Sequence, residues 1–385
     1  MGGRNRRARY PDASAPPVRA LLGLLVIVAG GAVIGMGVAT AAVAADPAKP
    51  PVREGEGGGA APKEDSATKP GAELRLLDVR RISGDAPHAA FTDLARFKSE
   101  WVAVFREGKG HVSPDGAIRV LVSRDGREFR SAARLTASDA DLRDPKLFQI
   151  GDELFIIAAA ALHDGGEVKH RTRVFRSRDA RDWSAPKDVG DPNVWIWRVD
   201  RGPDGKALAI GYSTVEPRFV RLYETRDGVE FRTVVERLDV EGYPNESATV
   251  FEPDGDAIVL LRRDPEPGLL GRGEPPYERF RFRELSRRIG GPELLRLDDG
   301  RLLAAVRLYD GKVRTALCFI DEKTGKLEEE LTLPSGGDTS YAGLVLHEGV
   351  LYMSYYSSHE GRTAVYLARV ALGDEGAAKA ESEKR

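Results

Sequence analysis

Arginines recur at one position of a repeating pattern in the sequence. Six short apolar runs each follow a tight turn, and the residue six places beyond the turn is Arg106, Arg262 or Arg307 in three of them. Tyr212 and Tyr356 occupy this position in two others. If the runs are equivalent strands around a common axis, the three guanidinium groups converge and can bind a carboxylate or sulfate by charge-assisted hydrogen bonds. Arginines that only cover the rim of the domain are the competing interpretation.

A second group of polar and aromatic residues precedes the apolar runs, where the first strand of each repeat should begin. Its members are Arg143-Asp144, Trp195 and Trp197, Asn245-Glu246, and Thr339-Ser340-Tyr341. At the axis, such carboxylates and a phenol could transfer protons or attack a substrate. Trp195, Trp197 and Tyr212 could offer a flat apolar platform for a ligand. A solvated strand end, or packing in the core for the aromatic residues, is the alternative for each of them.

The apolar runs recur with a period near fifty residues. The residues that follow the turns are Glu100, Asp152, Lys206, Asp256, Arg301 and Val350, which are 52, 54, 50, 45 and 49 residues apart. Asp-Gly and related pairs in the turns supply the positive φ that tight hairpins need. Helical periodicity is nearly absent after residue 73. Repeats of this length, with several strands each, predict an all-β, six-bladed β-propeller over residues 73–372.

A shorter motif repeats in phase with the apolar runs. SRDGREF (123–129), SRDARDW (177–183) and TRDGVEF (225–231) are near copies, and a weaker relic ends at Phe280. They resemble the Asp-box (BNR) repeats of the sialidase (neuraminidase) superfamily, shortened because the glycine follows the aspartate directly. In that motif the aspartate accepts hydrogen bonds from the turn and the aromatic residue packs beneath the hairpin. The resemblance therefore implies a sialidase-type propeller and says little about catalysis.

The likeness to sialidases extends to several candidate catalytic residues. Glu246 and Arg262 resemble the glutamate that opens an inner strand and the arginine that ends the next strand. Tyr341 resembles the nucleophilic tyrosine, and Arg314, with Arg307 as its competitor, resembles an arginine of the fifth blade. The resemblance implies an exo-acting glycoside hydrolase in which Tyr341 attacks the anomeric carbon while Glu246 accepts its proton. A neutral nucleophile suits an anionic sugar, because a carboxylate would be repelled, and sialidases are known to use tyrosine.

The sequence departs from the sialidase pattern in the first blade. Sialidases open this blade with an Arg-Ile-Pro motif whose arginine completes a triad, whereas residues 88–97 read HAAFTDLARF. We expect Arg106 to substitute from the neighbouring strand. The departure puts sialic acid itself in doubt, but an anionic or polyhydroxylated sugar remains the expected substrate.

The residue that protonates the leaving group has more than one candidate. In sialidases it is an aspartate of the first-blade loop, where this chain has His111 and Asp115. Asp144 is the rival, because its Arg-Asp-Pro-Lys context resembles a motif of five-bladed furanosidase and arabinanase propellers. In those enzymes the aspartate orients the sugar.

The terminal regions are typical of targeting and linker sequences. Residues 20–45 are uncharged and apolar and follow five arginines, which predicts a signal peptide or a signal anchor within 1–45. Residues 46–72 are rich in Pro, Gly and charge and predict a linker, and 373–385 predict a charged tail. We therefore expect an exported protein whose propeller lies outside the cytoplasm, with membrane contact only through its N-terminal segment.

Composition excludes several other classes of protein. Lys and Arg total 58 against 60 Asp and Glu, a balance that argues against a nucleic-acid-binding surface. The single cysteine, Cys318, cannot form an internal disulfide and lies in an apolar run, so we expect it in the core. The histidines and this cysteine have no metal-ligand spacing, so we predict no metal and no cofactor. We expect a monomer whose partner is a glycan or glycoside.

Three functions remain open at this stage. The first is an exo-acting hydrolase of the sialidase superfamily. The second is a furanosidase- or arabinanase-like enzyme with Asp144 and Glu246 in the main roles, which would predict five blades, against the six repeats. The third is a non-catalytic propeller that binds glycans or scaffolds partners. A hydrogen bond between Tyr341 and Glu246 on the axis would favour an enzyme.

Overall fold

The computed structural model describes residues 74–164 and 166–373, and its regular elements there are 24 β-strands. Within these residues, no helix is long and apolar enough to cross a membrane. The predicted targeting segment 1–45, the predicted linker 46–72 and the tail from residue 374 onward lie outside the described residues.

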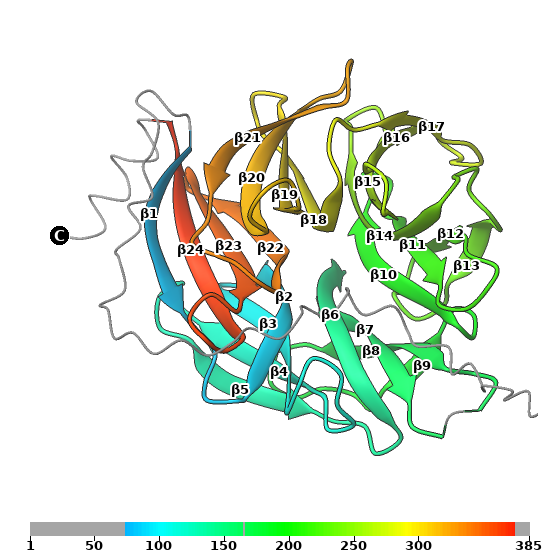
Figure 1. The fold of residues 1–385 in the computed structure, drawn as a ribbon. Coiled ribbons are helices and arrows are strands. Elements are labelled where there is room, and N and C mark those ends of the chain that lie inside the picture. The colour runs from blue at the N-terminus through cyan, green and yellow to red at the C-terminus, as the bar shows by residue number, and fades with distance from the viewer. Residues whose placement is uncertain (1–73, 165, 374–385) are drawn as a thin grey trace, which may run out of the picture. The chain divides into compact units, whose positions relative to one another are not determined.

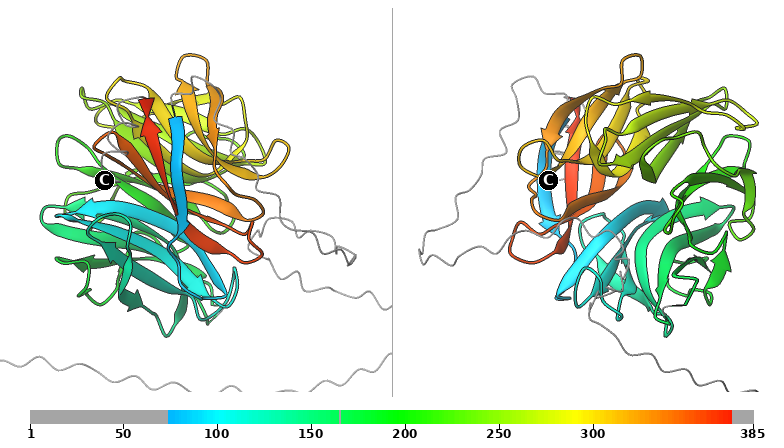
Figure 2. Two further views of the ribbon diagram at one scale, coloured as in Figure 1. Left: turned by 90° about the vertical axis from the view of Figure 1, so that its left-hand side faces the viewer. Right: turned by 45° about the vertical axis from the view of Figure 1, so that its right-hand side comes forward.

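The strands form six antiparallel sheets of four strands each, arranged around a central axis (Figure 1). Every inner strand contacts the inner strands of both neighbouring sheets, so the ring is closed. Figure 2 shows the same sheets from two further sides, each of them twisted. The predicted all-β, six-bladed propeller is therefore confirmed.

In the first three blades, the strands follow one another in chain order from the axis outward. Blade 1 contains β2 (His88–Phe97), β3 (Glu100–Gly108), β4 (Ala117–Ser123) and β5 (Arg130–Leu135). Blade 2 contains β6 (Ala140–Ile150), β7 (Glu153–Leu162), β8 (His170–Ser177) and β9 (Lys187–Val189). Blade 3 contains β10 (Val194–Arg201), β11 (Ala207–Ser213), β12 (Val220–Thr225) and β13 (Arg232–Val235).

The other three blades are also built from the axis outward, and the last includes the first strand of the chain. Blade 4 contains β14 (Tyr243–Phe251), β15 (Ala257–Asp264), β16 (Leu269–Gly273) and β17 (Arg281–Glu284). Blade 5 contains β18 (Ile289–Arg296), β19 (Leu302–Leu308), β20 (Arg314–Asp321) and β21 (Lys326–Thr332). Blade 6 contains β22 (Thr339–His347), β23 (Val350–Ser357), β24 (Ala364–Leu372) and β1 (Leu74–Arg81).

The two ends of the described chain meet in blade 6. Strand β1 pairs antiparallel with β24, from Leu74 opposite Leu372 to Arg81 opposite Tyr366. Figure 2 shows these strands, blue and red, side by side. Because the first strand completes the last sheet, the ring is held closed by backbone hydrogen bonds as well as by packing.

The predicted apolar runs are the second strands of the blades. They are apolar throughout because both faces of such a strand pack against neighbouring blades, as the burial of every residue of β19 illustrates. The space between adjacent blades is filled by clusters of aliphatic side chains, for example Leu303, Leu317, Leu351 and Met353 between blades 5 and 6. Cys318 lies fully buried in such a cluster, as predicted.

The three near-copies of the short motif form the same turn between the third and fourth strands of blades 1, 2 and 3. In each, one carboxylate oxygen of the aspartate accepts hydrogen bonds from the backbone N–H groups two and three residues later, at 2.8–2.9 Å. The residue after the aspartate has a positive φ: Gly126 at 66°, Ala180 at 59° and Gly228 at 73°. A glycine directly after the aspartate is thus the residue that this turn accepts without strain.

Candidate active site

Each of the six inner strands contains one β-bulge. The pairing between inner and second strand shifts register once in every blade, and the shift leaves one or two residues of the inner strand unpaired. The unpaired residues include Phe91, Asp144, Trp197, Glu246, Gly291 and Tyr341. A bulge re-aims a side chain out of the regular alternation of a strand. The fold therefore re-aims at least one residue of the inner strand in every blade, although in blade 5 this residue is Gly291, which has no side chain.

Several of these bulges hold strained backbone. Phe91, Asp144 and Tyr341 have φ values of 59°, 48° and 54°, in the left-handed region that residues other than glycine adopt infrequently. Such a conformation costs on the order of 1–3 kcal/mol per residue and persists only where the surroundings impose it. Strain of this kind collects at functional sites, which makes the bulges the first place to look for chemistry.

Three of the predicted residues meet in one hydrogen-bonded cluster, which we call the Tyr341 cluster: Tyr341, Glu246 and Arg262. The Tyr341 hydroxyl donates to Oε1 of Glu246 at 2.5 Å. Nη1 of Arg262 donates to both carboxylate oxygens of Glu246, at 2.9 and 3.0 Å, and lies 3.1 Å from the Tyr341 hydroxyl. All three residues are more than nine-tenths buried. Burial, and after it the charge of Glu246, holds the pKa of the Tyr341 phenol well above its ordinary value.

The partners of the Tyr341 cluster are themselves held in place. The backbone N–H of Gly291 donates to Oε2 of Glu246 at 2.9 Å. Arg262 forms an ion pair through Nε with Asp264 at 2.7 Å. A Cβ atom at Gly291 would lie 2.8 Å from the ring of Tyr341, so only glycine fits between the backbone and the phenol. This arrangement leaves the Tyr341 oxygen one strong acceptor for its proton.

Aromatic rings surround Tyr341. Phe91, Trp197 and Tyr356 have their ring centroids 5.5, 5.6 and 5.7 Å from that of Tyr341. Arg307 places its guanidinium carbon 5.2 Å from the same centroid. Two of the three arginines at the recurring position, in blades 4 and 5, therefore converge at the tyrosine.

Asp144 is the second carboxyl group of this region. It is 4% exposed, and burial raises its pKa to about 6, although the nearby charges of Arg143 and Lys146 oppose the shift. The negative charge of Glu246 adds to the rise, so the two carboxyl groups are close enough to interact. A carboxyl group that still holds a proton near pH 6 is suited to protonate a leaving group.

Arg143 and His111 lie on the blade 1 side of the same region. Nη1 of Arg143 donates to the carbonyl oxygen of His111 at 3.1 Å, and its guanidinium carbon lies 5.3 Å from the centre of the Phe91 ring. The His111 ring is 5.1 Å from that of Phe91 and bonds through Nδ1 to Asp338 at 2.9 Å. Asp338 also accepts from Arg307, at 2.9 Å. This set of contacts joins the predicted His111, Arg143 and Arg307.

Trp197 and Tyr212 belong to an aromatic group in blade 3. Tyr212 stacks on Trp195 with ring centroids 5.7 Å apart, and it lies 6.4 Å from Trp197. All three residues are more than nine-tenths buried. Trp197 is the member of this group that touches Tyr341.

The structure keeps three predicted residues away from the Tyr341 cluster. Every nitrogen of Arg106 is bound within its own surroundings, to Asp141 at 2.8 and 3.1 Å and to groups of the loop that contains Gly110, and its side chain is 0% exposed. These bonds hold Arg106 between its own loop and Asp141 of blade 2, and its replacement of the missing first-blade arginine stays a prediction. Arg314 forms an ion pair with Glu329, and Asp115 is exposed and accepts from backbone N–H of Lys109 in its own loop.

Sequence reasoning missed a group of buried charges next to the bulges. Asp93, Lys146, Arg198 and Glu293 are each the first paired residue after a bulge, and all are less than a tenth exposed. Asp200, on the same strand as Arg198, has its pKa raised to about 7 by burial. The signal in the sequence was a charged residue inside an otherwise apolar strand, as in AAFTDLA and GPELL.

One group of described residues has ligand types that a metal ion could use. His88, His111 and Asp338 bring possible ligand atoms within 4.8 Å of one another. Asp338 is however already paired with Arg307. Burial, together with the nearby charges of Arg106 and Arg143, lowers the pKa of His88 to about 4. A cation would have to compete with these guanidinium groups, so the site favours the ion pairs.

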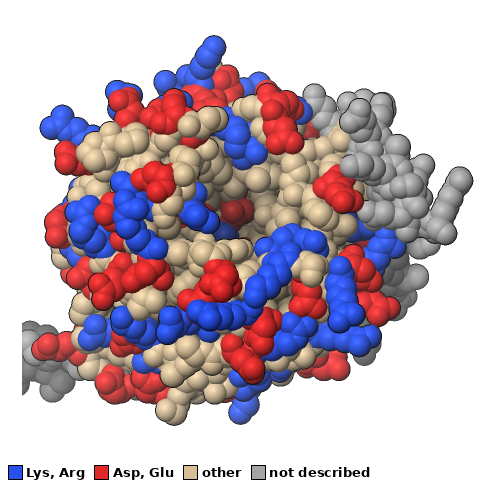
Figure 3. Space-filling view, turned by 180° about the vertical axis from the view of Figure 1, so that it is seen from behind, with Lys and Arg blue, Asp and Glu red and all other residues tan. Residues whose placement is uncertain are grey.

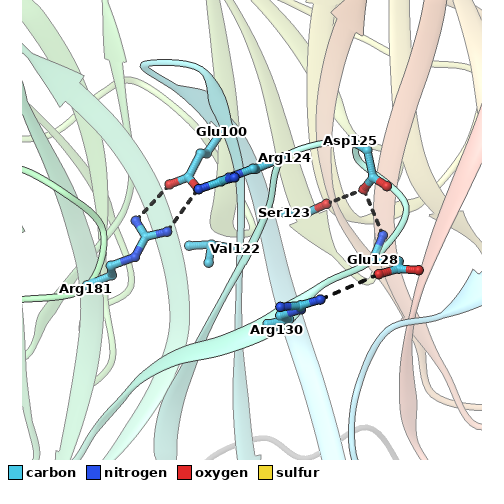
Figure 4. Close-up of a pocket in the computed structure, with 8 residues that line it drawn as sticks. All are labelled: Glu100, Val122, Ser123, Arg124, Asp125, Glu128, Arg130 and Arg181. Atoms are coloured by element: carbon cyan, nitrogen blue, oxygen red, sulfur yellow. Dashed lines mark hydrogen bonds and ion pairs between the residues drawn. The ribbon is translucent and has the colours of Figure 1, made fainter.

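Hollows on the surface of the described residues differ in their surroundings. Figure 3 shows one near the centre of the face that it draws, with acidic atoms on its floor and basic side chains beside it. The pocket in Figure 4, of about 410 Å³, lies between blades 1 and 2, where Arg181 reaches Glu100 at 2.7 and 2.9 Å. No residue of the Tyr341 cluster lines this second pocket, and its Arg181–Glu100 ion pair connects the two blades.

Comparison with known proteins gives matches in structure and none in sequence. The chain matches no protein-family profile and no curated protein sequence. A protein of unknown function from Dyadobacter fermentans superimposes with a TM-score of 0.68 at 19% identity, over 78% of this chain and 99% of its own.

Two similar solved structures are glycosidases. A Trypanosoma rangeli sialidase, bound to 2,3-difluorosialic acid as a covalent intermediate, matches with a TM-score of 0.60 at 10% identity, over 81% of this chain and 61% of its own. A Penicillium chrysogenum α-L-arabinanase bound to arabinobiose matches with a TM-score of 0.57 at 12% identity, over 78% of this chain and 97% of its own. The chain therefore has the fold of propeller glycoside hydrolases.

Proposed function

We propose that the protein is a glycoside hydrolase in which Tyr341 is the nucleophile and Glu246 is its base. The observation that carries the proposal is the hydrogen bond of 2.5 Å between the Tyr341 hydroxyl and Glu246, with Arg262 bound to both carboxylate oxygens. A binding module has no need for a buried phenol whose proton points at a carboxylate. An enzyme that attacks through tyrosine needs this pair, because the phenol is a weak nucleophile until a base takes its proton.

The reaction divides into two steps that share the same groups. In the first, the Tyr341 oxygen bonds to the anomeric carbon as its proton passes to Glu246, while the glycosidic bond breaks and Asp144 donates its proton to the departing oxygen. In the second, Asp144 accepts a proton from water, the hydroxide bonds to the anomeric carbon, and the bond to Tyr341 breaks. Glu246 then returns the proton to the phenolate, which restores the starting state.

The charges near Tyr341 favour an acidic terminal sugar. Arg262 and Arg307 lie against the tyrosine, and Arg143 lies against the neighbouring ring of Phe91. Guanidinium groups bind carboxylates well, and a neutral phenol avoids the repulsion that a carboxylate nucleophile would meet. The sialidase of the same fold is known as a covalent intermediate with 2,3-difluorosialic acid. We therefore propose that the protein is a sialidase-type exo-hydrolase of an acidic sugar. We also propose that it is exported, because segment 20–45 is apolar and uncharged.

A furanosidase- or arabinanase-like reaction is the second candidate. It would use Asp144 and Glu246 as an acid and base pair, and the raised pKa of Asp144, about 6, supports this because one of two such carboxyl groups must hold a proton. The six repeats were expected to oppose this alternative. The match to an arabinanase over 97% of its length removes that objection.

The test is hydrolysis of fluorogenic glycosides by the full-length protein and two tyrosine variants. The panel contains acidic sugars and arabinofuranosides, and the variants are Tyr341→Phe and, as a matched control, Tyr355→Phe, whose hydroxyl binds the carbonyl of Pro334 instead. Release of an acidic sugar that only Tyr341→Phe abolishes supports the proposal. Equal activity of both variants overturns the tyrosine mechanism in favour of the carboxyl pair. A folded protein with no activity but with glycan binding overturns both enzymes in favour of a binding module.

A further inference from the structure

A group of buried charges lies directly beside the bulge that holds Tyr341. Asp93, Lys146, Arg198 and Glu293 come from four different blades and are 1, 1, 6 and 8% exposed. We call them the buried charge group. Nothing in the proposed reaction uses them, and burying charge is costly unless each one is paired. Their retention in the centre of the ring therefore calls for a structural or positioning role.

The members of the buried charge group are connected through Arg198. Its Nη1 and Nη2 atoms lie 3.2 and 3.3 Å from the carboxylate oxygens of Asp93, and Nη2 also forms an ion pair with Glu293. Asp93 in turn accepts a hydrogen bond from the backbone N–H of Leu147 at 2.7 Å. One guanidinium thus joins blades 1, 3 and 5, and the carboxylate of Asp93 adds blade 2.

Arg198 contacts the backbone of the Tyr341 bulge directly, and Lys146 is connected to it through Thr92. Nη2 of Arg198 lies 3.4 Å from the carbonyl oxygen of Ala342, the residue after the tyrosine. The hydroxyl of Thr92 donates to the carbonyl oxygen of Tyr341 at 3.3 Å, while Nζ of Lys146 binds the carbonyl oxygen of Thr92 at 2.7 Å. The two carbonyl groups that the bulge turns away from its own sheet thus meet donors supplied by blades 1 and 3.

Two close approaches fix the position of the bulge further. A Cβ atom at Gly343 would lie 2.5 Å from Oδ1 of Asp93, so this strand can approach the buried charge group only because residue 343 is glycine. On the other side, Nζ of Lys146 lies 5.4 Å from the centre of the Trp197 ring, which packs at an angle against the ring of Tyr341. The charges therefore hold both the backbone of Tyr341 and one of the rings against it.

We propose that the buried charge group is a positioning device that holds the strained bulge at Tyr341, so that its hydroxyl faces Glu246. The bulge needs such contacts because its backbone is strained. Ser340 and Tyr341 have φ values of 93° and 54° and would relax without external contacts. The inference rests on the proposed function only in that it makes Tyr341 the reacting group. Arg198 is then a positioning residue that acts through the tyrosine and does not touch the substrate.

The test compares three changes at Arg198 in the full-length protein. Arg198→Lys keeps a buried cation, Arg198→Met removes it, and the double variant Asp93→Asn, Arg198→Met removes the charge together with Asp93, one of its two acidic partners. The double variant keeps the test decisive if the single loss of charge prevents folding. Arg369→Met is the matched control, because Arg369 is 1% exposed and paired with Asp78 in the outer strands of blade 6.

Two readouts separate positioning from general stability. The first is the ¹⁹F NMR spectrum of protein labelled with 3-fluorotyrosine, in which the signal of Tyr341 is identified by its loss in Tyr341→Phe. The second is the separation of kcat from KM on the substrate found in the hydrolysis panel. A misplaced reacting group costs on the order of 100-fold in rate. We expect Arg198→Met and the double variant to shift the Tyr341 signal and lower kcat by about that factor, with KM nearly unchanged.

The outcomes distinguish this inference from the proposed function. Retention of the signal and of kcat in Arg198→Lys, with both lost in the double variant and kept in Arg369→Met, supports positioning. An unshifted Tyr341 signal in the double variant overturns it, and so does an equal shift in Arg369→Met. Because the NMR signal needs no turnover, a shifted signal in a protein where Tyr341→Phe remains active would support positioning of the bulge while overturning Tyr341 as nucleophile.

Discussion

The pH dependence of the reaction should be set on its alkaline side by Asp144. Burial raises the pKa of this carboxyl group from 3.8 to about 6. At pH 7 roughly one molecule in ten then carries the proton, against roughly one in 1,600 for an unshifted aspartate, a gain of about 150-fold in the active acid. At pH 7 this raised pKa lowers the stability of the folded protein by about 3 kcal/mol.

The sign of the effect follows from the role of the group. A general acid must be protonated, so kcat/KM should be constant below a pH of about 6 on this side and fall about tenfold per pH unit above it. The same raised pKa means that the contribution of Asp144 to stability is complete below pH 3.8 and is lost as the pH rises through about 6. This part of the stability therefore declines between pH 3.8 and about 6, whereas activity declines above a pH of about 6.

The assay is the pH profile of kcat/KM for the wild type, Asp144→Asn and Asp115→Asn. Asp144→Asn should lose the alkaline limb and lower kcat by about 10²–10⁴-fold, with the smallest loss on substrates whose leaving group needs no proton. Asp115→Asn is the control, because Asp115 is exposed and bonds within its own loop. An alkaline limb that survives in Asp144→Asn but disappears in Asp115→Asn would refute the assignment of the acid.

Three further predictions concern the frame of the site. Arg106→Met should lower the free energy of unfolding in urea by about 3–5 kcal/mol with KM unchanged, because it leaves Asp141 buried without its partner; a changed KM and full stability would contradict this. Gly291→Ala should reduce kcat to a few per cent or less in a glycosidase assay, because the added Cβ would lie 2.8 Å from the Tyr341 ring; full activity would show that the ring can move. The pKa of His88 is lowered to about 4 by burial, so the free energy of unfolding should rise between about pH 4 and 6.5, and His88→Gln should flatten this rise in urea titrations at several pH values.

The fold could be predicted from the sequence because its repeats are local. Each turn that carries Asp-Gly or a related pair indicates a hairpin. The fifty-residue period gives the number of blades without any knowledge of distant contacts. The contact between Tyr341 and Glu246 was harder to predict, because the residues are 95 positions apart and lie in blades 6 and 4. Only the resemblance to a known family pointed to this pair.

The recurring arginines show where periodicity stops being informative. Arg106, Arg262 and Arg307 occupy one position of the repeat, but only the last two face Tyr341. The difference comes from the nearest carboxylate, since Asp141 of the next blade binds Arg106 at 2.8 Å and holds it there. Such a partner belongs to another repeat, and no pattern within one repeat reveals it.

The bulges explain why residue type and position in the strand were not enough to predict which side chains form the site. A bulge changes the face of the strand to which a side chain points. The sequence of a strand gives no sign of its bulge unless a glycine occupies it. All six inner strands have one, although only blades 2, 4 and 6 place a carboxyl group or a phenol there, at Asp144, Glu246 and Tyr341. The bulge is therefore a general feature of the inner strands in this fold, and whether it can take part in a reaction depends on the side chain that it carries. The charged residue that follows the bulge in blades 1, 2, 3 and 5 contacts a different blade from its own. The reacting group and the residues that hold it therefore come from different repeats.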